Sequence, residues 1–197
     1  MNKMRVIVLL LTIPISCHLN AQIVKNVELS GGWAHVTQNN GLDGFNVGAS
    51  GWFTNRVSVA FDFDNVHDTT SLTQFALQTT GGLITVKSTM QDYLIGPRVF
   101  FSKKDVKVLR SLVPFAEFQI GGSHLSSTVS QVGGLSQSAS DNAGTWLLGG
   151  GGDFLLGSHW AGRLNLGLLR THLSNQAQSR LRLMFGVAYS FGSRKVR

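Results

Sequence analysis

The chain has 197 residues, which is enough for one domain, and only 14% of them are charged although the formal net charge is +7. Proteins that bind nucleic acid carry dense basic patches, so a chain with so few charges and 23 glycines excludes nucleic acid as a partner. Beyond the first residues there is no run of 18 or more apolar side chains, which excludes a helical membrane protein.

The first residues of the chain have the features of a secretory signal peptide. Residues 1–5 are basic, and the apolar run over residues 6–13 is much shorter than the roughly 20 residues that a spanning helix needs. We predict a signal peptide over residues 1–21 and a mature domain over residues 22–197, with lipidation at Cys17 as the alternative. Cys17 is the only cysteine, so the mature domain would have neither disulfides nor thiolate metal sites.

From Val27 onward, segments of about ten residues alternate between apolar and polar side chains, and turn-rich polar stretches separate them. A period of two is typical of β-strands, so the chain is predicted to be all-β and antiparallel. The eight predicted strands cover residues 27–36, 44–53, 57–64, 90–101, 112–124, 144–156, 160–171 and 179–191. Eight is the smallest even number of strands that bacterial transmembrane barrels use.

The connections between these strands alternate between short and long. Residues 54–56 and 157–159 are tight turns, whereas residues 67–89 suggest a hairpin that continues beyond the bilayer. Residues 125–143 are rich in Ser, Gly and Asn and are predicted to be a mobile loop. One rim of the barrel is therefore expected to be short and the other long. Pro97 falls in a predicted strand, where it would remove a ladder hydrogen bond.

The polar face of the strands indicates which side of the barrel faces water. A soluble lipocalin-like barrel has the same period with its apolar side inward. Here the polar face is small and carries both signs of charge, which is typical of a narrow lumen filled with ion pairs. The apolar face would then meet lipid, and a closed barrel satisfies every backbone amide there. Aromatic residues expected near the two interfaces are Trp33, Trp52, Tyr93, Trp146, Trp160 and Tyr189.

The turn over residues 157–159 sets a register that pairs Asp153 with Arg163, both pointing inward. We therefore predict an internal salt bridge between them, because opposite charges attract strongly where water is scarce. We place Arg98, Glu117, Arg180 and Arg182 in the same network. The predicted lumen charge network comprises Glu28, Asp62, Asp64, Asp92, Arg98, Glu117, Asp153, Arg163, Arg180 and Arg182.

Two sets of motifs resemble known proteins. Gly186, Tyr189 and Phe191 form a Gly-x-x-aromatic-x-aromatic pattern that resembles the C-terminal assembly signal of outer-membrane barrels. The motifs Gly96-Pro97-Arg98, Pro114-Phe115-Ala116, Gly149 to Asp153, Arg163 and Leu181 to Gly192 resemble the small outer-membrane β-barrel domain proteins, relatives of the OmpA transmembrane domain. The resemblance implies an eight-stranded antiparallel up-and-down transmembrane β-barrel with short periplasmic turns and longer extracellular loops.

The same resemblance implies a location in the bacterial outer membrane and contact with the barrel-assembly machinery. It also implies contact with outer-membrane lipids including lipopolysaccharide, whose phosphates Arg170 could meet, and we expect a monomer. We expect a structural or surface-interaction role through the extracellular loops, with a narrow channel for small solutes or ions as an alternative.

A third possibility is a lipid A-modifying enzyme. The His-x-Ser pairs at His124 and His172 are similar to the catalytic pair of the lipid A deacylase, but no Asp or Glu follows Asp153 to orient a histidine. The chain is therefore expected not to be an enzyme. No cofactor is expected, and the six histidines lack the spacing of metal ligands.

Overall fold

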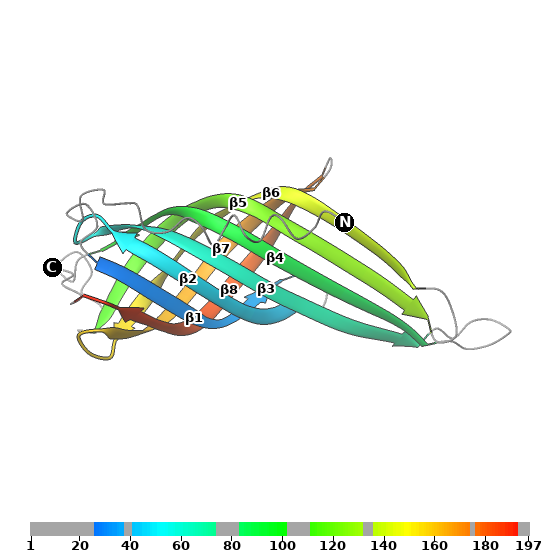
Figure 1. The fold of residues 1–197 in the computed structure, drawn as a ribbon, viewed down its shortest axis with the longest axis horizontal. Helices are drawn as coiled ribbons and strands as arrows, with labels where there is room; N and C mark the ends of the chain where they lie inside the picture. The colour runs from blue at the N-terminus through cyan, green and yellow to red at the C-terminus, as the bar shows by residue number, and fades with distance from the viewer. Residues whose placement is uncertain are drawn as a thin grey trace, which may run out of the picture.

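The fold is a closed barrel of eight antiparallel β-strands (Figure 1). This computed structural model describes residues 26–37, 41–73, 83–101, 111–131, 136–173 and 176–192. The strands are β1 (Asn26–Val36), β2 (Leu42–Trp52), β3 (Val57–Thr73), β4 (Leu83–Phe100), β5 (Leu112–Gln131), β6 (Gln137–Leu155), β7 (Trp160–Leu173) and β8 (Gln176–Ser190). Among the described residues, no helix is long and apolar enough to cross a membrane.

Each strand pairs with its neighbours in chain order, and β1 pairs with β8 to close the barrel. The closing register runs from Glu28 opposite Ser190 to Val36 opposite Arg182. The tight connections, between β2 and β3 and between β6 and β7, lie at one end of the barrel, which we call the short-turn end (Figure 1). The predicted all-β, eight-stranded, antiparallel up-and-down barrel is confirmed.

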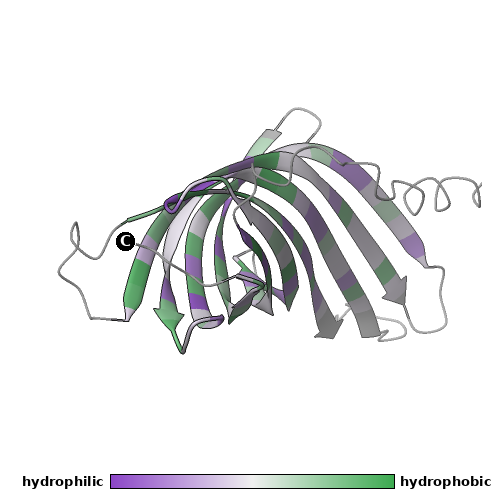
Figure 2. Ribbon diagram, turned by 60° about the vertical axis from the view of Figure 1, so that its left-hand side comes forward, coloured by the Kyte–Doolittle hydropathy of each residue, from purple (hydrophilic) through white to green (hydrophobic). Residues whose placement is uncertain are grey.

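Alternate side chains point outward and inward along every strand, so hydrophilic and hydrophobic positions alternate along the ribbons (Figure 2). On β8, the outward Phe185 is 63% exposed, whereas its neighbour Met184 points inward and is 1% exposed. Large apolar side chains are exposed in this way on all eight strands. So broad an apolar outer surface is unfavourable in water and favourable in hydrocarbon, which agrees with a barrel that spans a bilayer.

Glycines allow the strands to approach closely where the barrel closes. Gly32 on β1 lies opposite Gly186 on β8. A Cβ atom on Gly186 would lie 2.3 Å from the carbonyl oxygen of Gly31, and one on Gly32 would lie 2.2 Å from that of Phe185. Any side chain at either position would collide with the backbone of the neighbouring strand, so the seam requires glycine.

Pro97 lies within β4 and points outward, as the alternation predicts. It pairs with Val59 on β3, but the ladder between β4 and β5 has no pair at Gly96 or Pro97 and resumes at Arg98. The barrel therefore accommodates the missing amide where one of the two ladders is interrupted.

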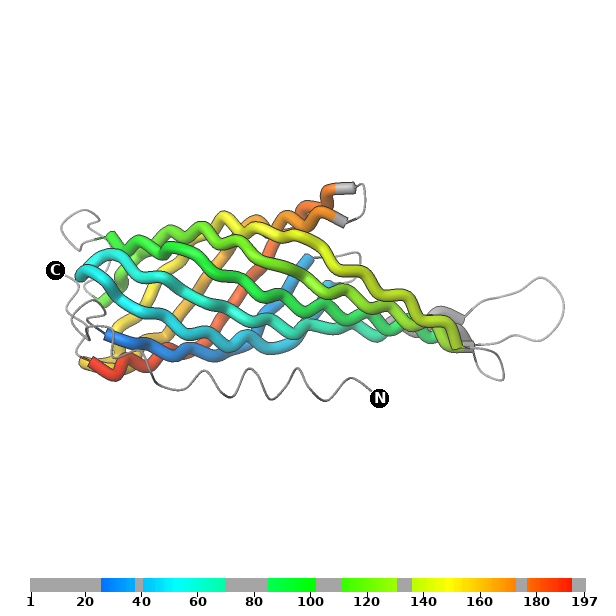
Figure 3. The backbone as a smooth tube through the Cα atoms, turned by 45° about the horizontal axis from the view of Figure 1, so that its top comes forward, coloured from blue at the N-terminus to red at the C-terminus, as the bar shows by residue number. Residues whose placement is uncertain are grey.

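Four neighbouring strands extend beyond the rest at the long end of the barrel (Figures 1 and 3). The predicted hairpin extension agrees with β3 and β4, although its centre at residues 74–82 lies outside the described residues. The predicted loop over residues 125–143 is wrong for most of its length, because β5 continues to Gln131 and β6 begins at Gln137. Hydroxyl pairs link these two strands, including Thr128 Oγ1 with Ser138 Oγ at 3.0 Å.

Most of the predicted interfacial aromatic residues face outward, but Trp52 does not. Trp33, Tyr93 and Trp160 are between 43% and 50% exposed. Trp52 is buried inside the barrel and stacks on Phe100, with 4.4 Å between the ring centroids. The prediction for Trp52 is therefore wrong: it occupies the inward row of β2, and Phe53 beside it points outward.

Candidate functional site

The polar face of the strands lines the lumen, where the first of three ion-paired groups centres on Arg163 of β7. Its Nε and Nη2 donate to the two carboxylate oxygens of Asp153, each at 2.7 Å. Nη2 also donates to Oε1 of Glu28 at 2.5 Å, so Arg163 joins β6, β7 and β1. The three side chains are almost completely buried. The salt bridge that the register predicted between Asp153 and Arg163 is present.

The second group centres on Arg98 of β4. Its Nε donates to Oε2 of Glu117 at 2.7 Å, and its Nη2 donates to Oδ2 of Asp62 at 3.2 Å. Two amides complete the group: Gln119 donates to Asp62 at 2.6 Å, and Asn165 donates to Glu117 at 2.5 Å. Each buried carboxylate thus has a cation and a neutral donor, which offsets the cost of removing it from water.

The third group joins residues on opposite sides of the lumen. Arg182 of β8 donates from Nε and Nη2 to the two oxygens of Asp64 on β3, at 2.7 and 3.0 Å. Asn46 of β2 also donates to Asp64, at 2.8 Å. A two-pronged contact of this kind fixes the guanidinium plane as well as its charge.

Asp92 and Arg180 lie closer to the long end, outside the three ion-paired groups. Asp92 accepts a hydrogen bond from Ser123, whose hydroxyl also pairs with Thr145. Arg180 contacts Sδ of Met90 at 3.7 Å and hydrogen-bonds to the side chain of Gln178. Neither forms a salt bridge with a described residue, so Asp92 and Arg180, both of which we expected in the network, are separate from the three ion-paired groups.

Two apolar clusters lie in the lumen, one on each side of the ion-paired groups. The cluster at the short-turn end contains Trp52, Phe100, Val113 and Phe115, with Leu155 packed against it. Phe115 also lies beneath the guanidinium groups of Arg98 and Arg163, at 4.9 and 5.5 Å from the ring centroid. The cluster at the long end contains Ala34, Val36, Leu42, Val66, Met90, Leu94, Leu147 and Leu169, with Leu125 packed against it. Side chains therefore fill the lumen at both ends as well as in the middle.

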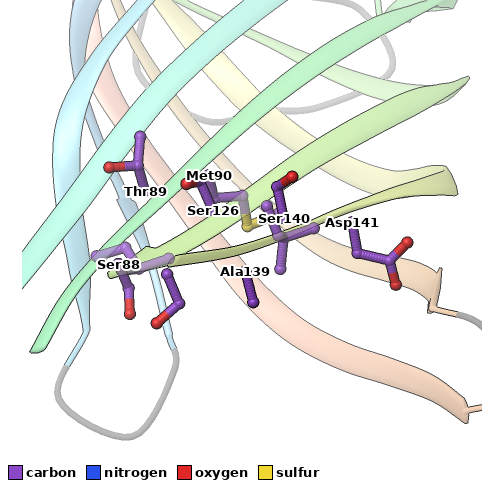
Figure 4. A pocket seen from close by; sticks show the side chains of 10 residues that line it. Ser88, Thr89, Met90, Ser126, Ala139, Ser140 and Asp141 are labelled. Atoms are coloured by element: carbon purple, nitrogen blue, oxygen red, sulfur yellow. The ribbon is translucent and has the colours of Figure 1, made fainter. Parts of the chain in front are cut away.

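A cavity of about 270 Å³ lies at the long end, directly outside the second apolar cluster (Figure 4). Leu42, Met90 and Leu125 belong to its lining and also to that cluster or its margin, so the cavity ends at the cluster. Hydroxyl groups from β4, β5 and β6 and the carboxylate of Asp141 contribute most of its remaining lining (Figure 4). We call this cavity the outer mouth.

Of the two His-x-Ser pairs, His124, Ser126 and His172 lie on the outer surface at the long end. His124 and Ser126 share the outward face of β5, and His124 Nδ1 is 2.7 Å from Oδ1 of Asn142. His172 is exposed on β7, whereas Ser174 lies outside the described residues. On β4 to β8, no carboxylate lies in an outward row within the described ranges, so neither histidine shares its face of the sheet with an acid.

The residues of the predicted assembly signal lie at the end of β8. Gly186 faces the lumen side at the closing seam, and Tyr189 points outward beside Trp160 and Phe191, with centroid distances of 4.8 and 5.2 Å. Phe191 follows the last residue of the strand and is 62% exposed. The rings of Tyr189 and Phe191 therefore form an apolar edge at the short-turn end.

No protein-family model and no curated protein sequence matches the chain. Several solved structures match it. The attachment invasion locus protein Ail of Yersinia pestis, solved with the heparin analogue sucrose octasulfate, superposes with a TM-score of 0.55 at 16% identity, over 84% of this chain and 97% of Ail. A major outer membrane protein of Thermus thermophilus gives a TM-score of 0.55 at 11% identity, over 84% of this chain and 99% of that one.

The outer membrane protein OprG of Pseudomonas aeruginosa gives a TM-score of 0.50 at 11% identity, over 85% of this chain and 96% of OprG. The chain has the fold of the small outer-membrane β-barrels. At these identities the likeness concerns the fold. The barrel matches these neighbours over nearly their whole length, so the likeness covers the barrel as a whole.

Sequence reasoning missed the two apolar clusters inside this outer-membrane barrel. Leu147 and Leu169 occupy inward positions of β6 and β7 and are completely buried. The signal was present, because both residues fall on the small and polar row of their strands. Their meaning depends on their height along the barrel axis, which one strand alone does not reveal.

Proposed function

We propose that this outer-membrane barrel is a surface-interaction protein that presents its projecting strands to the exterior of the cell. The observation that carries the proposal is a combination: the lumen is filled at both ends, while four strands extend beyond the barrel wall. We call residues 68–73, 83–88, 125–131 and 137–143 the projecting sheet.

The projecting sheet has two open edges. Pairing between β2 and β3 ends at His67, so residues 68–73 of β3 pair only with β4. Pairing between β6 and β7 begins at Gly144, so residues 137–143 of β6 pair only with β5. A strand edge offers backbone donors and acceptors to an added strand, which is a common way to bind an extended peptide. The outer mouth is lined mostly by residues of this sheet, and the hydroxyl groups of Ser88, Ser126 and Ser140 belong to the same surface.

The filled lumen supports a role at the surface over the alternative of a narrow channel. A conducting path would have to pass Trp52, Phe100 and Phe115 at one end and the Leu147 and Leu169 cluster at the other. Side chains packed in this way hinder the passage of hydrated ions, which need a continuous path of water across a lumen.

The proposal is tested with a variant in which two-residue turns replace residues 68–88 and 125–141, so that β3 to β6 all end near the barrel wall. Bacteria that express the protein or this variant are allowed to adhere to glass coated with heparin or with a fibrillar matrix protein. Bare glass is the control surface. Heparin is included because the Ail structure holds an analogue of it. We expect adhesion above that of cells lacking the protein, and its loss in the shortened variant.

A difference in gel mobility before and after boiling shows that the shortened variant still folds. A matched control variant keeps all strands at full length and carries Gly157→Ala in the short-turn connection. A Cβ atom at this position meets nothing within 4 Å. The proposal is wrong if cells with the intact protein adhere no better than cells without it, or if the folded short variant adheres equally well.

A further inference from the structure

On the outward face of β4 to β8, the apolar surface ends toward the long end of the barrel, and two glycines lie at this boundary. Two outward glycines, Gly122 of β5 and Gly144 of β6, lie directly opposite each other. A Cβ atom on Gly144 would meet nothing within 4 Å, and one on Gly122 would meet only the carbonyl oxygen of Ala143, at 3.6 Å. We call these two positions the glycine patch. Neither glycine is required by close packing, in contrast to the seam glycines.

Polar side chains surround the glycine patch on three sides. His172 of β7 is opposite Gly144, and Tyr93 of β4 is opposite Gly122. One position closer to the short-turn end, Arg170 is opposite Trp146. On the other side of the patch, His124 is opposite Asn142 and holds the amide oxygen of Asn142 at 2.7 Å.

The hydrogen bond between His124 and Asn142 occupies the amide oxygen of Asn142 and leaves its amino group as a donor. Arg170 and His172 are exposed, and neither makes a hydrogen bond or ion pair with another described residue. Neighbouring strands are about 4.8 Å apart, so donors on β4 and β7 lie roughly 14 Å apart at the backbone, with the two glycines between them. These groups can converge on one compact anion.

The charge in the outward rows around the glycine patch is of one sign. The outward faces of β4 to β8 carry Lys87 and Arg170 and, within the described residues, no carboxylate. The only outward carboxylate next to a histidine of this rim, among the residues that the structure describes, is Asp43, which pairs with His35 on the other side of the barrel. An anion at the glycine patch would therefore be attracted by Arg170 on this face. The nearest acid along β6 is Asp141, in the inward row, which accepts a hydrogen bond from the backbone N–H of Asn142 at 2.8 Å.

The position of the glycine patch along the barrel axis indicates which kind of anion it would bind. The next row of outward residues toward the short-turn end is apolar except for Arg170, with Ile95, Ile120 and Trp146 on neighbouring strands. The next row toward the long end is polar, with Gln91, His124 and Asn142. A lipid whose chains cover Ile120 and Leu148 would place its headgroup at the level of the glycine patch.

We propose that the glycine patch, with Arg170, His172, Asn142 and Tyr93 around it, binds a phosphate group on the headgroup of an outer-leaflet glycolipid. Arg170 supplies the permanent positive charge and a forked pair of donors. The imidazole of His172, the amide of Asn142 and the hydroxyl of Tyr93 supply further donors, and the two glycines let the phosphate approach the backbone. This site is independent of the surface interaction proposed above, because it faces the membrane rather than the exterior.

The site is tested with the full barrel, purified in mild detergent and titrated with lipid A that carries both phosphates, with native mass spectrometry to count bound lipid. Two variants remove the site by different means: Arg170→Gln with His172→Gln removes donors, and Gly144→Leu fills the patch without a change of charge. Lys87→Gln is the matched control, since it removes an outward cation of β4 outside the site. Gel mobility before and after boiling shows that each variant is folded.

We expect one tightly bound lipid on the wild-type barrel, affinity lower by about tenfold or more in both site variants, and a change below about twofold in Lys87→Gln. Dephosphorylated lipid A should bind as weakly as the site variants do. Inorganic phosphate is titrated in a separate arm to distinguish a headgroup from a free ion. The proposal is overturned if the folded site variants bind like wild type, if dephosphorylated lipid binds equally well, or if inorganic phosphate binds as tightly as the lipid.

Discussion

Replacing Arg163 with Met should destabilise the barrel strongly, because two buried carboxylates share this one cation. Arg163 contacts both oxygens of Asp153 and one oxygen of Glu28, and none of these side chains is more than 1% exposed. Removing one partner of a buried ion pair typically costs about 3–5 kcal/mol. We expect a loss in this range rather than twice it, since a stranded carboxyl group can take up a proton.

A neutral triple variant separates the ion pairs from the packing. Arg163→Met with Asp153→Asn and Glu28→Gln leaves no buried charge at this position, so it should recover most of the stability lost in Arg163→Met. Asp153→Asn alone should cost less than Arg163→Met, about 1–3 kcal/mol, because Glu28 still neutralises Arg163. Lys87→Met, at an exposed position, should change stability by about 0.5 kcal/mol or less.

The assay is urea unfolding of the barrel in short-chain phospholipid bilayers, followed by tryptophan fluorescence and by gel mobility. The free energy of unfolding is compared between variants at an unchanged dependence on urea concentration. A loss of less than about 1 kcal/mol in Arg163→Met, or a triple variant no more stable than the single one, would refute the reasoning.

Three further predictions concern other parts of the barrel. In planar bilayers at high salt, the protein should produce no discrete conductance steps, because apolar clusters fill both ends of the lumen; regular steps that scale with protein concentration would contradict this. Gly186→Ala should prevent closure and abolish the mobility difference on boiling, whereas Gly157→Ala should keep it. Phe191→Ser should lower the amount of folded barrel in the outer membrane, measured against the equally exposed Phe185→Ser; equal amounts for the two would show that Phe191 has no special part in assembly.

The period-two pattern made the fold predictable from the sequence. On β8 it assigned Leu181, Leu183 and Phe185 to the outer face, and all three point outward. Asp153 and Arg163 could be paired because the turn between them is short, so their distance along the chain determines the register. Partners on strands that are distant in sequence, such as Arg182 and Asp64, could be named as members of a network but not as a pair.

Two features were not accessible from the pattern, for physical reasons. The extension of β5 and β6 consists largely of Ser, Thr and Gln, which do not alternate in polarity, so the strands gave no amphipathic signal. The inward position of Trp52 follows from parity, but aromatic residues near strand ends are common at the membrane interface, and that expectation was applied instead. In the extension of β5 and β6, side-chain polarity does not follow side-chain direction. At Trp52, the residue type suggested an outward direction and the side chain points inward.

The ion-paired groups also constrain how this barrel can fold. Arg163 on β7 meets Glu28 on β1, 135 residues earlier in the chain, and Arg182 on β8 meets Asp64 on β3, 118 residues earlier. Neither contact exists in an isolated hairpin, so a partly inserted sheet would carry Glu28, Asp64 and Arg182 into hydrocarbon without these partners. Closure of β8 against β1 completes both of these long-range contacts at once. Insertion is therefore expected to be all-or-none rather than hairpin by hairpin.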